Sequence, residues 1–107
     1  MRRYGQCLRL RPERRDEYLR HHAAVWPEVR QALAGAHIRN YSIFLWGDLL
    51  FGYFEYMGGD FAADMAQLAE DPKTQQWWAL MRPMQLPMEG RGEKEWWADM
   101  QEVFHLE

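Results

Sequence analysis

The sequence predicts an α+β domain of the ferredoxin-like type, a βαββαβ sandwich in which helices cover one face of a four-stranded sheet. Two observations favour this fold. Apolar residues recur in period two over four segments and at helical spacing between them, in the order strand, helix, strand, strand, helix, strand. A chain of 107 residues also has the length of one compact domain. We therefore expect a single domain, residues 1–107.

A strand and a helix are expected first. Residues 3–11 alternate in period two, and Pro12 then removes a backbone donor and should end the strand. From residue 13 to residue 24 the apolar spacing is helical. Because Pro27 cannot form the normal hydrogen bond to the preceding turn, the helix should kink or restart there and continue to Gly35.

A tight hairpin is the next expected element. Residues 37–46 and 49–57 are both apolar, and the turn dipeptide Gly47-Asp48 separates them. Apolar side chains fall on both faces of the first of these strands, with Tyr41, Ile43 and Leu45 on one face and Phe44 and Trp46 on the other. Since the helices cover one face only, the bare face should pack on a second copy of the chain or enclose a pocket. We expect a homodimer of closely packed sheets.

Two further helices and a last strand should complete the chain. Apolar residues at helical spacing predict one helix over residues 61–68. An Asp-Pro pair at 71–72 is typical of the start of another helix, which is expected to run to about residue 81. Prolines and glycines between residues 83 and 94 predict an irregular loop. Residues 101–106 alternate weakly and are predicted to form the last strand.

Composition and charge exclude several function classes. Thirteen Lys and Arg residues against sixteen Asp and Glu residues give a net charge of -3, which provides no basic surface for nucleic acid or for an anionic membrane. No apolar run is long enough to span a membrane, and no apolar stretch follows the basic N-terminal residues as it would in a secretory signal. Cys7, the single cysteine, cannot form an internal disulfide. We expect a cytoplasmic protein.

The sequence carries no recognisable cofactor or metal motif. Gly90-Arg91-Gly92 lacks the third glycine and the preceding strand of a dinucleotide-binding loop. His21 and His22 are adjacent, so on a helix their side chains diverge by about 100° and cannot bind one metal ion together. We expect neither a cofactor nor a metal ion.

Aromatic residues are the most unusual feature of the composition. They make up 15% of the chain, and four of the six tryptophans form the adjacent pairs Trp77-Trp78 and Trp96-Trp97. Neighbouring side chains of a helix or strand point in different directions, so one member of each pair can lie in a core while the other faces a cavity or a subunit contact. The pairs are a first indication of a ligand site.

His22 is the candidate for chemistry. One helical turn separates it from Tyr18 on one side and from Trp26 on the other, which places an imidazole between two aromatic rings. Most helical histidines in such surroundings are core residues with a satisfied ring nitrogen, and Tyr41 in a strand can equally be a core residue. These residues alone indicate a small-molecule pocket of unknown substrate.

Four blocks of sequence cover nearly the whole chain in a characteristic order. They are residues 18–28 (YLRHHAAVWPE), 40–43 (NYSI), 76–78 (QWW) and 101–104 (QEVF). The tyrosine-x3-histidine-x3-tryptophan-proline string and the paired tryptophans are each rare, and they are rarer together. With these blocks the chain resembles the L-rhamnose mutarotase family.

The resemblance implies a dimeric ferredoxin-like fold, a dimeric α+β barrel, in which each subunit binds a 6-deoxyhexose in a cavity of the sheet and needs no cofactor. It implies that His22 is the proton donor. It also implies that four residues bind the sugar: Tyr18, Tyr41, Trp77 and Trp78. The tight turn at 47–48 and residues 83–97 depart from the family's pattern, so the sugar can be L-rhamnose, L-fucose or another 6-deoxyhexose.

Mutarotation also agrees with the residues present. The reaction needs a proton delivered to the ring oxygen and one removed from the anomeric hydroxyl, and a histidine with an ordinary pKa of about 6.5 exchanges protons in both directions at neutral pH. Two alternatives remain open. Other dimeric ferredoxin-like domains are cofactor-free monooxygenases or lactone isomerases. A non-catalytic dimeric sugar-binding module would use His22 only as a hydrogen-bond partner.

Overall fold

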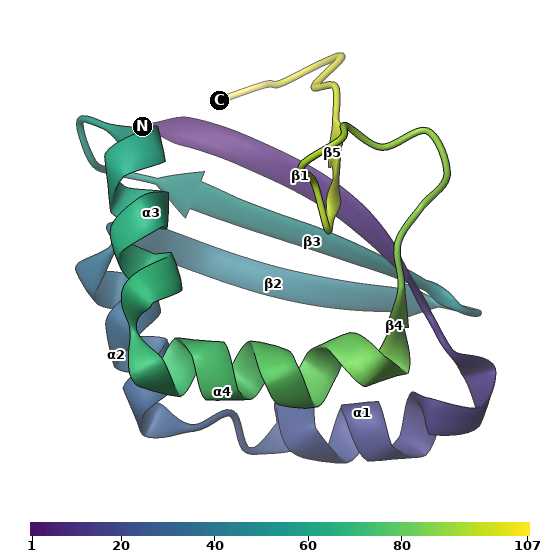
Figure 1. The fold of residues 1–107 in the computed structure, drawn as a ribbon. Coiled ribbons are helices and arrows are strands. Elements are labelled where there is room, and N and C mark those ends of the chain that lie inside the picture. The colour runs from purple at the N-terminus through teal and green to yellow at the C-terminus, as the bar shows by residue number, and fades with distance from the viewer.

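The computed structural model describes all residues from 1 to 107. A curved sheet lies beside a layer of helices (Figure 1). The strands are β1 (Arg2–Leu10), β2 (Ile38–Trp46), β3 (Leu49–Tyr56), β4 (Gln85–Leu86) and β5 (Ala98–Met100). The α-helices are α1 (Arg15–Ala23), α2 (Pro27–Gly35), α3 (Phe61–Glu70) and α4 (Pro72–Met81), and short 3-10 helices lie at Pro12–Arg14 and Arg82–Met84.

The sheet has the strand order β2-β3-β1-β4, and each neighbouring pair is antiparallel. β1 is central, because β3 pairs with one of its edges while β4 and β5 share the other. Helices α1 and α2 connect β1 to the far edge at β2, and helices α3 and α4 connect β3 to β4 on the other side of β1. This is the arrangement of a ferredoxin-like domain, so the predicted α+β fold class is confirmed.

The last strand is not where the sequence predicts it, because residues 101–106 have no regular structure. β5 ends at Met100, which lies opposite Gly5 of β1. In that register residue 103 would lie opposite Arg2, where β1 begins. Residues 104–106, half of the predicted strand, therefore run beyond the end of β1 and have no backbone partner within one chain.

The fourth strand of the sheet is instead built from two pieces. β4 pairs with Arg9 and Leu10 of β1, and β5 pairs with residues 5–7 on the same edge. Residues 87–97 interrupt the strand between these pieces, and we call them the inserted loop. Pro87 accounts for the interruption because it has no backbone N–H to donate to the ladder. The loop predicted over residues 83–94 is thus partly wrong, since it contains β4.

Local signals set most helix ends as predicted. α1 ends at Ala23 and α2 starts at Pro27, so the helix restarts at the proline instead of only kinking. The Asp71 carboxylate accepts hydrogen bonds from the backbone N–H and the hydroxyl of Thr74, at 2.9 and 2.8 Å, and caps α4. The predicted two-residue hairpin turn is present between β2 and β3, and its first residue, Gly47, has a φ of 58° that glycine adopts without strain.

β2 contains a bulge that the alternating pattern conceals. Its register on β3 shifts between Arg39 and Ser42, where Asn40 adopts a φ of 50°. Asparagine tolerates this left-handed conformation better than most residues. The extra residue changes the phase of the strand, so that Ile38 before the bulge and Tyr41 and Ile43 after it all line the space under the helices.

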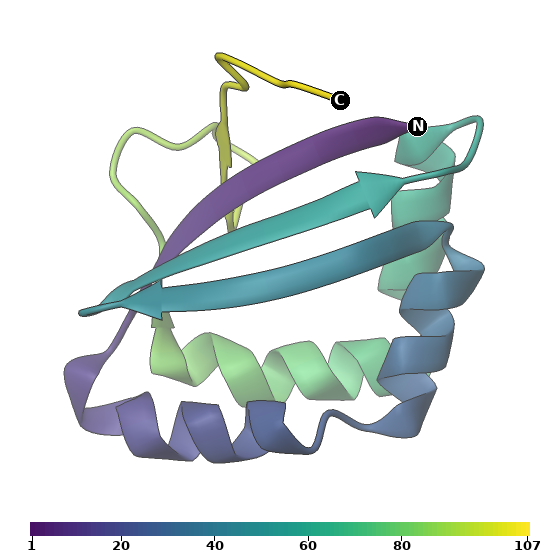
Figure 2. The same cartoon turned by 180° about the vertical axis from the view of Figure 1, so that it is seen from behind.

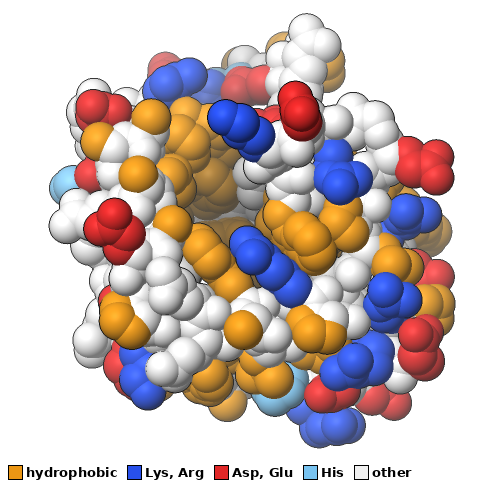
Figure 3. All heavy atoms as spheres, viewed as in Figure 1, with side chains coloured by type: hydrophobic (Ala, Val, Ile, Leu, Met, Phe, Trp, Pro, Cys, Tyr) orange, Lys and Arg blue, Asp and Glu red, His pale blue; other side chains and the backbone are white.

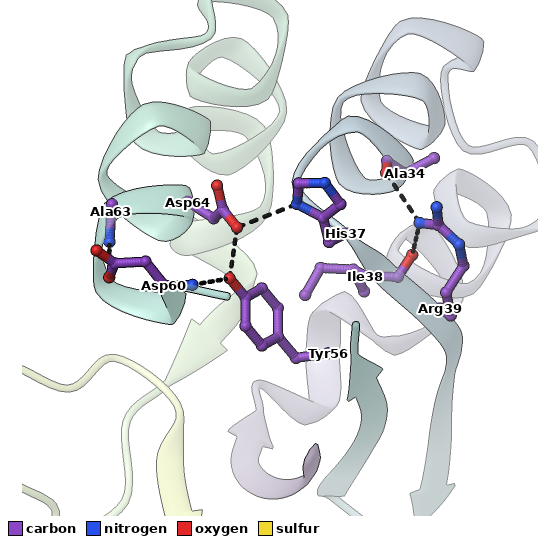
Figure 4. A network of polar contacts seen from close by, with 8 residues as sticks. All are labelled: Ala34, His37, Ile38, Arg39, Tyr56, Asp60, Ala63 and Asp64. Atoms are coloured by element: carbon purple, nitrogen blue, oxygen red, sulfur yellow. Dashed lines mark hydrogen bonds and ion pairs between the residues drawn. The ribbon is translucent and has the colours of Figure 1, made fainter. Parts of the chain in front are cut away.

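A polar network fixes α3 to the ends of β2 and β3 (Figure 4). The Asp64 carboxylate accepts a hydrogen bond from the Tyr56 hydroxyl and lies 3.1 Å from Nδ1 of His37, and the backbone N–H of Asp60 donates to the same hydroxyl at 2.9 Å. Gly58 belongs to this corner, because a Cβ at that position would collide with the Tyr56 hydroxyl. Glycine is therefore needed at this position for packing.

The core lies between the helices and the inner face of the sheet, in two clusters. The larger contains Leu8, Leu10, Tyr18, Val29, Leu50, Trp77, Met81 and Met84. The smaller lies towards α3 and contains Ala36, Ile38, Phe54, Tyr56 and Leu68. Two of the predicted sugar-binding residues, Tyr18 and Trp77, are therefore also core residues. Substitutions at these positions should affect the stability of the fold as well as the site.

The outer face of the sheet carries exposed aromatic side chains. In the view from behind, no helix crosses the strands (Figure 2). On β2, 64% of Phe44 and 78% of Trp46 are exposed. Val103 and Phe104 of the C-terminal segment are also highly exposed. The prediction that the helices leave one apolar face uncovered is confirmed. No helix of this chain combines the length and the apolar character that crossing a membrane requires.

Candidate active site

A cavity of about 1110 Å³ lies between the helix layer and the inner face of the sheet. Of its 34 lining residues, 23 are hydrophobic, so a few polar side chains must orient any ligand inside it. Figure 3 shows this side of the molecule, where hydrophobic side chains line a hollow and charged side chains lie around its rim. All five predicted site residues line this cavity: Tyr18, His22, Tyr41, Trp77 and Trp78.

His22 has one ring nitrogen engaged and one free of any partner within the chain. Its Nδ1 lies 2.9 Å from the backbone oxygen of Tyr18, one turn earlier on α1. A carbonyl oxygen only accepts, so Nδ1 carries the proton and donates it. In the neutral ring Nε2 is then the acceptor. The ring stacks on Tyr18 with centroids 4.1 Å apart and meets the edge of Trp77 at 5.4 Å, which fixes its orientation.

The surroundings of His22 favour its neutral form. Burial lowers the pKa of His22 below its ordinary value of 6.5, and the neighbouring His21 acts in the same direction. The hydrogen bond to the Tyr18 carbonyl opposes these effects and is weaker than burial. At neutral pH the imidazole is therefore uncharged, with a lone pair on Nε2 that can take a proton.

The two tyrosines supply hydroxyl groups from opposite sides of the cavity. Tyr18 comes from α1 and is 2% exposed, and burial raises its pKa to about 12. Tyr41 comes from the bulge of β2, beside Phe54 at a ring-centroid distance of 5.4 Å. The residue is 37% exposed, yet the protein around the phenol, followed by the nearby Tyr18, raises its pKa well above the ordinary value. Both phenols keep their protons at neutral pH and can donate hydrogen bonds.

The two adjacent tryptophans of α4 divide as the sequence predicts. Trp77 is 7% exposed and belongs to the larger core cluster, while Trp78 is only partly buried. The Arg82 guanidinium lies over the Trp78 ring, 5.5 Å from its centroid. Both rings contribute to the cavity wall. Trp77 is mainly a core residue, and Trp78 is mainly a residue of the wall.

Trp26 does not occupy the place expected from helical spacing. The prediction put it one turn after His22 on the same helix, but α1 ends at Ala23 and Trp26 directly precedes the first residue of α2. Its ring meets the edge of Trp77 at 5.2 Å. Trp26 therefore packs behind the cavity wall instead of beside the imidazole.

Several cavity residues escaped the sequence analysis. Gln85 is 6% exposed and forms hydrogen bonds with both Tyr18 and Trp96. No pattern in the sequence identifies it as a site residue. Gln6 donates a hydrogen bond to Asp99 at 2.9 Å across β1 and β5, and burial is the main cause that raises the pKa of this carboxyl. The pairing of Trp96 with Trp97 was the one available hint that the inserted loop contributes to a site.

No three or more His, Cys, Asp or Glu side chains of the chain are grouped as the ligands of a metal ion would be. The cavity instead offers an imidazole, two phenols and aromatic rings. These groups can accept and donate protons and can stack on the apolar face of a ring-shaped ligand.

Sequence comparison finds related proteins that match nearly the whole chain. The family model described as L-rhamnose mutarotase matches residues 3–106. An L-rhamnose mutarotase of Lactiplantibacillus plantarum is 36% identical over 105 residues, which cover 98% of each chain. One of Burkholderia ambifaria is 39% identical over 101 residues, covering 94% of this chain and 93% of the relative.

Two solved structures have the same fold. The crystal structure of an L-rhamnose mutarotase from Formosa agariphila superposes with a TM-score of 0.79 at 23% identity, and both chains are covered completely. Tetracenomycin F2 cyclase from Streptomyces glaucescens, a type-II polyketide cyclase, superposes with a TM-score of 0.71 at 16% identity, again over both whole chains. Because the second protein has a different chemistry, the fold alone does not assign an activity.

Proposed function

Because the chain belongs to the L-rhamnose mutarotase family, we propose that its aromatic cavity interconverts the α and β anomers of a 6-deoxyhexose, with L-rhamnose as the expected sugar. The observation that carries the assignment of the site is the placement of His22. Its Nδ1 is held by a backbone carbonyl, its pKa is lowered by burial, and its ring lines the same cavity as four aromatic side chains.

The reaction opens and closes the sugar ring without oxidation. Neutral His22 takes the proton of the anomeric hydroxyl at Nε2, the bond between the anomeric carbon and the ring oxygen breaks, and the ring oxygen receives a proton. Both oxygens are attached to the same carbon, so one nitrogen can reach them in turn, and the imidazolium formed in the first transfer is the proton donor for the second. Rotation of the aldehyde and the reverse transfers give the other anomer.

The aromatic residues position the sugar for these transfers. Tyr18 and Tyr41 stay protonated, so they donate hydrogen bonds to sugar hydroxyls and do not compete with His22 as bases. The flat Trp78 ring is only partly buried and suits the apolar C–H face of a pyranose. Positioning of this kind keeps the open-chain sugar in place between ring opening and ring closure, while its aldehyde group rotates.

Saturation-transfer NMR tests the proposed reaction directly. Irradiation of the anomeric proton of one anomer should transfer saturation to the other in the presence of the protein, for L-rhamnose and, in a panel, for L-fucose and ordinary aldoses. Exchange that is fastest for one 6-deoxyhexose identifies the substrate. Binding without exchange for every sugar would contradict the proposed function and leave a sugar-binding module.

The pH dependence of exchange follows from the state of His22. Since the neutral imidazole starts the reaction and burial lowers its pKa, kcat/KM should be constant above pH 6.5 and fall only as the pH drops below that value. NMR exchange rates across a pH series measure this profile. An exchange rate that rises on acidification would show that the charged ring is the active form and would contradict the assignment.

We also propose that the chain is a homodimer that covers the outer face of the sheet. Phe44 and Trp46 on β2 and Val103 and Phe104 in the C-terminal segment are the exposed apolar groups that a second copy would bury. Sedimentation at micromolar concentration should give twice the chain mass of 12.9 kDa. Replacing both Phe44 and Trp46 by serine should give a folded monomer. A parent protein that sediments as a monomer would overturn this proposal.

A further inference from the structure

Gln85 lies between Trp96 of the inserted loop and Tyr18 of α1. The indole Nε1 of Trp96 is 2.8 Å from Oε1 of Gln85. An indole N–H only donates, so the oxygen of the amide must face the tryptophan. Nε2 then faces the Tyr18 hydroxyl, at 3.4 Å. The donor group of Trp96 thus fixes which end of the amide meets the tyrosine.

The direction of the second contact determines what the Tyr18 hydroxyl can do. An amide NH₂ only donates, so the phenol oxygen accepts this hydrogen bond and its own proton stays free. Gln85 and Tyr18 are both buried, at 6% and 2% exposed, and both line the cavity. Because the Gln85 amide donates to the phenol oxygen, the Tyr18 O–H is left free to point into the cavity.

Arg82, at the end of α4, holds Trp96 in place by a second contact. The Arg82 guanidinium lies 5.3 Å from the centroid of the Trp96 ring and 5.5 Å from that of Trp78. Trp97, the next residue, packs its ring against Gly52 of β3, where a Cβ would lie 3.4 Å from the nearest ring atom. The loop that interrupts the fourth strand therefore closes one wall of the cavity and places the indole N–H on Gln85.

We propose that Gln85 is a positioning residue for the reaction, and that Trp96 fixes its orientation. By donating to the Tyr18 oxygen, Gln85 turns the Tyr18 proton towards a hydroxyl of the bound sugar. The inference rests on the proposed function, because it assigns Tyr18 as a donor to that sugar. It adds a role for the inserted loop, which supplies the Trp96 N–H. This donor sets the direction of the hydrogen bonds that run from Trp96 through Gln85 to Tyr18.

Two substitutions of Gln85 separate this role from a structural one. Gln85→Glu keeps an acceptor for Trp96 but replaces the NH₂ donor by a carboxylate oxygen. That oxygen accepts a hydrogen bond from the Tyr18 hydroxyl and so turns it away from the sugar. Gln85→Met has a similar volume, loses both bonds and leaves the Tyr18 proton free but undirected. We expect kcat/KM to fall about tenfold or more for Gln85→Glu and less for Gln85→Met. A structural role alone predicts instead that any loss of exchange follows the fraction of unfolded protein, which denaturant unfolding measures, with parental kcat/KM for the folded fraction of both variants.

A double-mutant cycle shows whether Gln85 acts through Tyr18. In a Tyr18→Phe background there is no hydroxyl to direct, so adding Gln85→Glu should lower kcat/KM no further. Gln31→Glu is the matched control, since Gln31 is exposed on α2, does not line the cavity and receives the same charge change. It should exchange anomers at the parental rate. Losses that simply add in the double variant would overturn the proposal.

Trp96→Phe tests the orienting group on its own. It keeps an aromatic ring over Arg82 but removes the N–H that fixes the Gln85 amide, and we expect a loss of about threefold in kcat/KM. Parental exchange in this variant would overturn the part assigned to Trp96. An active parent whose Gln85→Glu variant is equally active overturns the role of Gln85 alone, whereas a parent that exchanges no sugar overturns the proposed function as well.

Discussion

Replacing His22 by asparagine should remove most anomer exchange while the protein stays folded. The amide is polar and similar in size, and it can still donate to the Tyr18 carbonyl as Nδ1 does now. It does not titrate near neutrality, so the proton transfers at Nε2 are lost. General acid–base catalysis by one side chain contributes on the order of 10²- to 10⁴-fold, and we expect a loss in that range. NMR exchange rates at saturating sugar measure the effect.

His21 provides the matched control for this variant. It is the neighbour of His22 on α1, but it does not line the cavity, and its Nε2 lies 3.9 Å from a carboxylate oxygen of Glu17 at the surface. His21→Asn should therefore exchange anomers nearly as fast as the parent. If the two variants lose exchange to the same extent, His22 is not the group that transfers the proton.

Truncating Trp77 to alanine should have the largest effect on stability. Its ring is 7% exposed and packs against His22 and Trp26 within the larger core cluster. Removing a buried tryptophan ring costs about 3 to 5 kcal/mol in transfer free energy and cavity formation. Denaturant unfolding without sugar should show this loss in the free energy of unfolding. A loss below about 1 kcal/mol would show that the ring is not part of the core.

Trp78→Leu is the companion variant and should affect binding instead. Leucine keeps apolar volume beside Arg82 but loses the flat face on which a pyranose can stack. We expect weaker sugar binding with nearly parental stability, and saturable quenching or enhancement of tryptophan fluorescence by L-rhamnose reports the binding. Parental affinity in this variant would make Trp78 structural and leave Trp96 as the better stacking surface.

The order of elements could be predicted from the sequence because local chemistry marks their ends. Pro12 ends β1, Pro27 begins α2, and Asp71 caps α4 through its own side chain. These signals act within a few residues and need no tertiary contact. The same holds for the two-residue turn before β3, where Gly47 adopts a left-handed conformation. An alternating strand pattern and a helical one then suffice to predict the fold class.

The candidate site residues could also be predicted from the sequence, but their geometry could not. The spacing of Tyr18 and His22 by one helical turn predicts that their rings meet, and they stack at 4.1 Å. The same rule placed Trp26 wrongly, because the helix ends before that residue is reached. Tyr41 enters the cavity through a bulge that changes the phase of β2, and an alternating pattern does not show where a bulge lies.

The sequence by itself determined the element order, the ring stack on α1 and the exposed apolar face of the sheet, because short-range spacing and local backbone preferences control them. Only the tertiary structure decided where the fourth strand lies and what the inserted loop does. Strand pairing depends on which backbone is within reach, and β1, which begins at Arg2, does not extend far enough to pair with residues 104–106. Gln85 gains its partners only because β4 brings it beside Tyr18 and the loop returns Trp96 to it. Contacts between residues so far apart in the chain leave no periodic trace in the sequence.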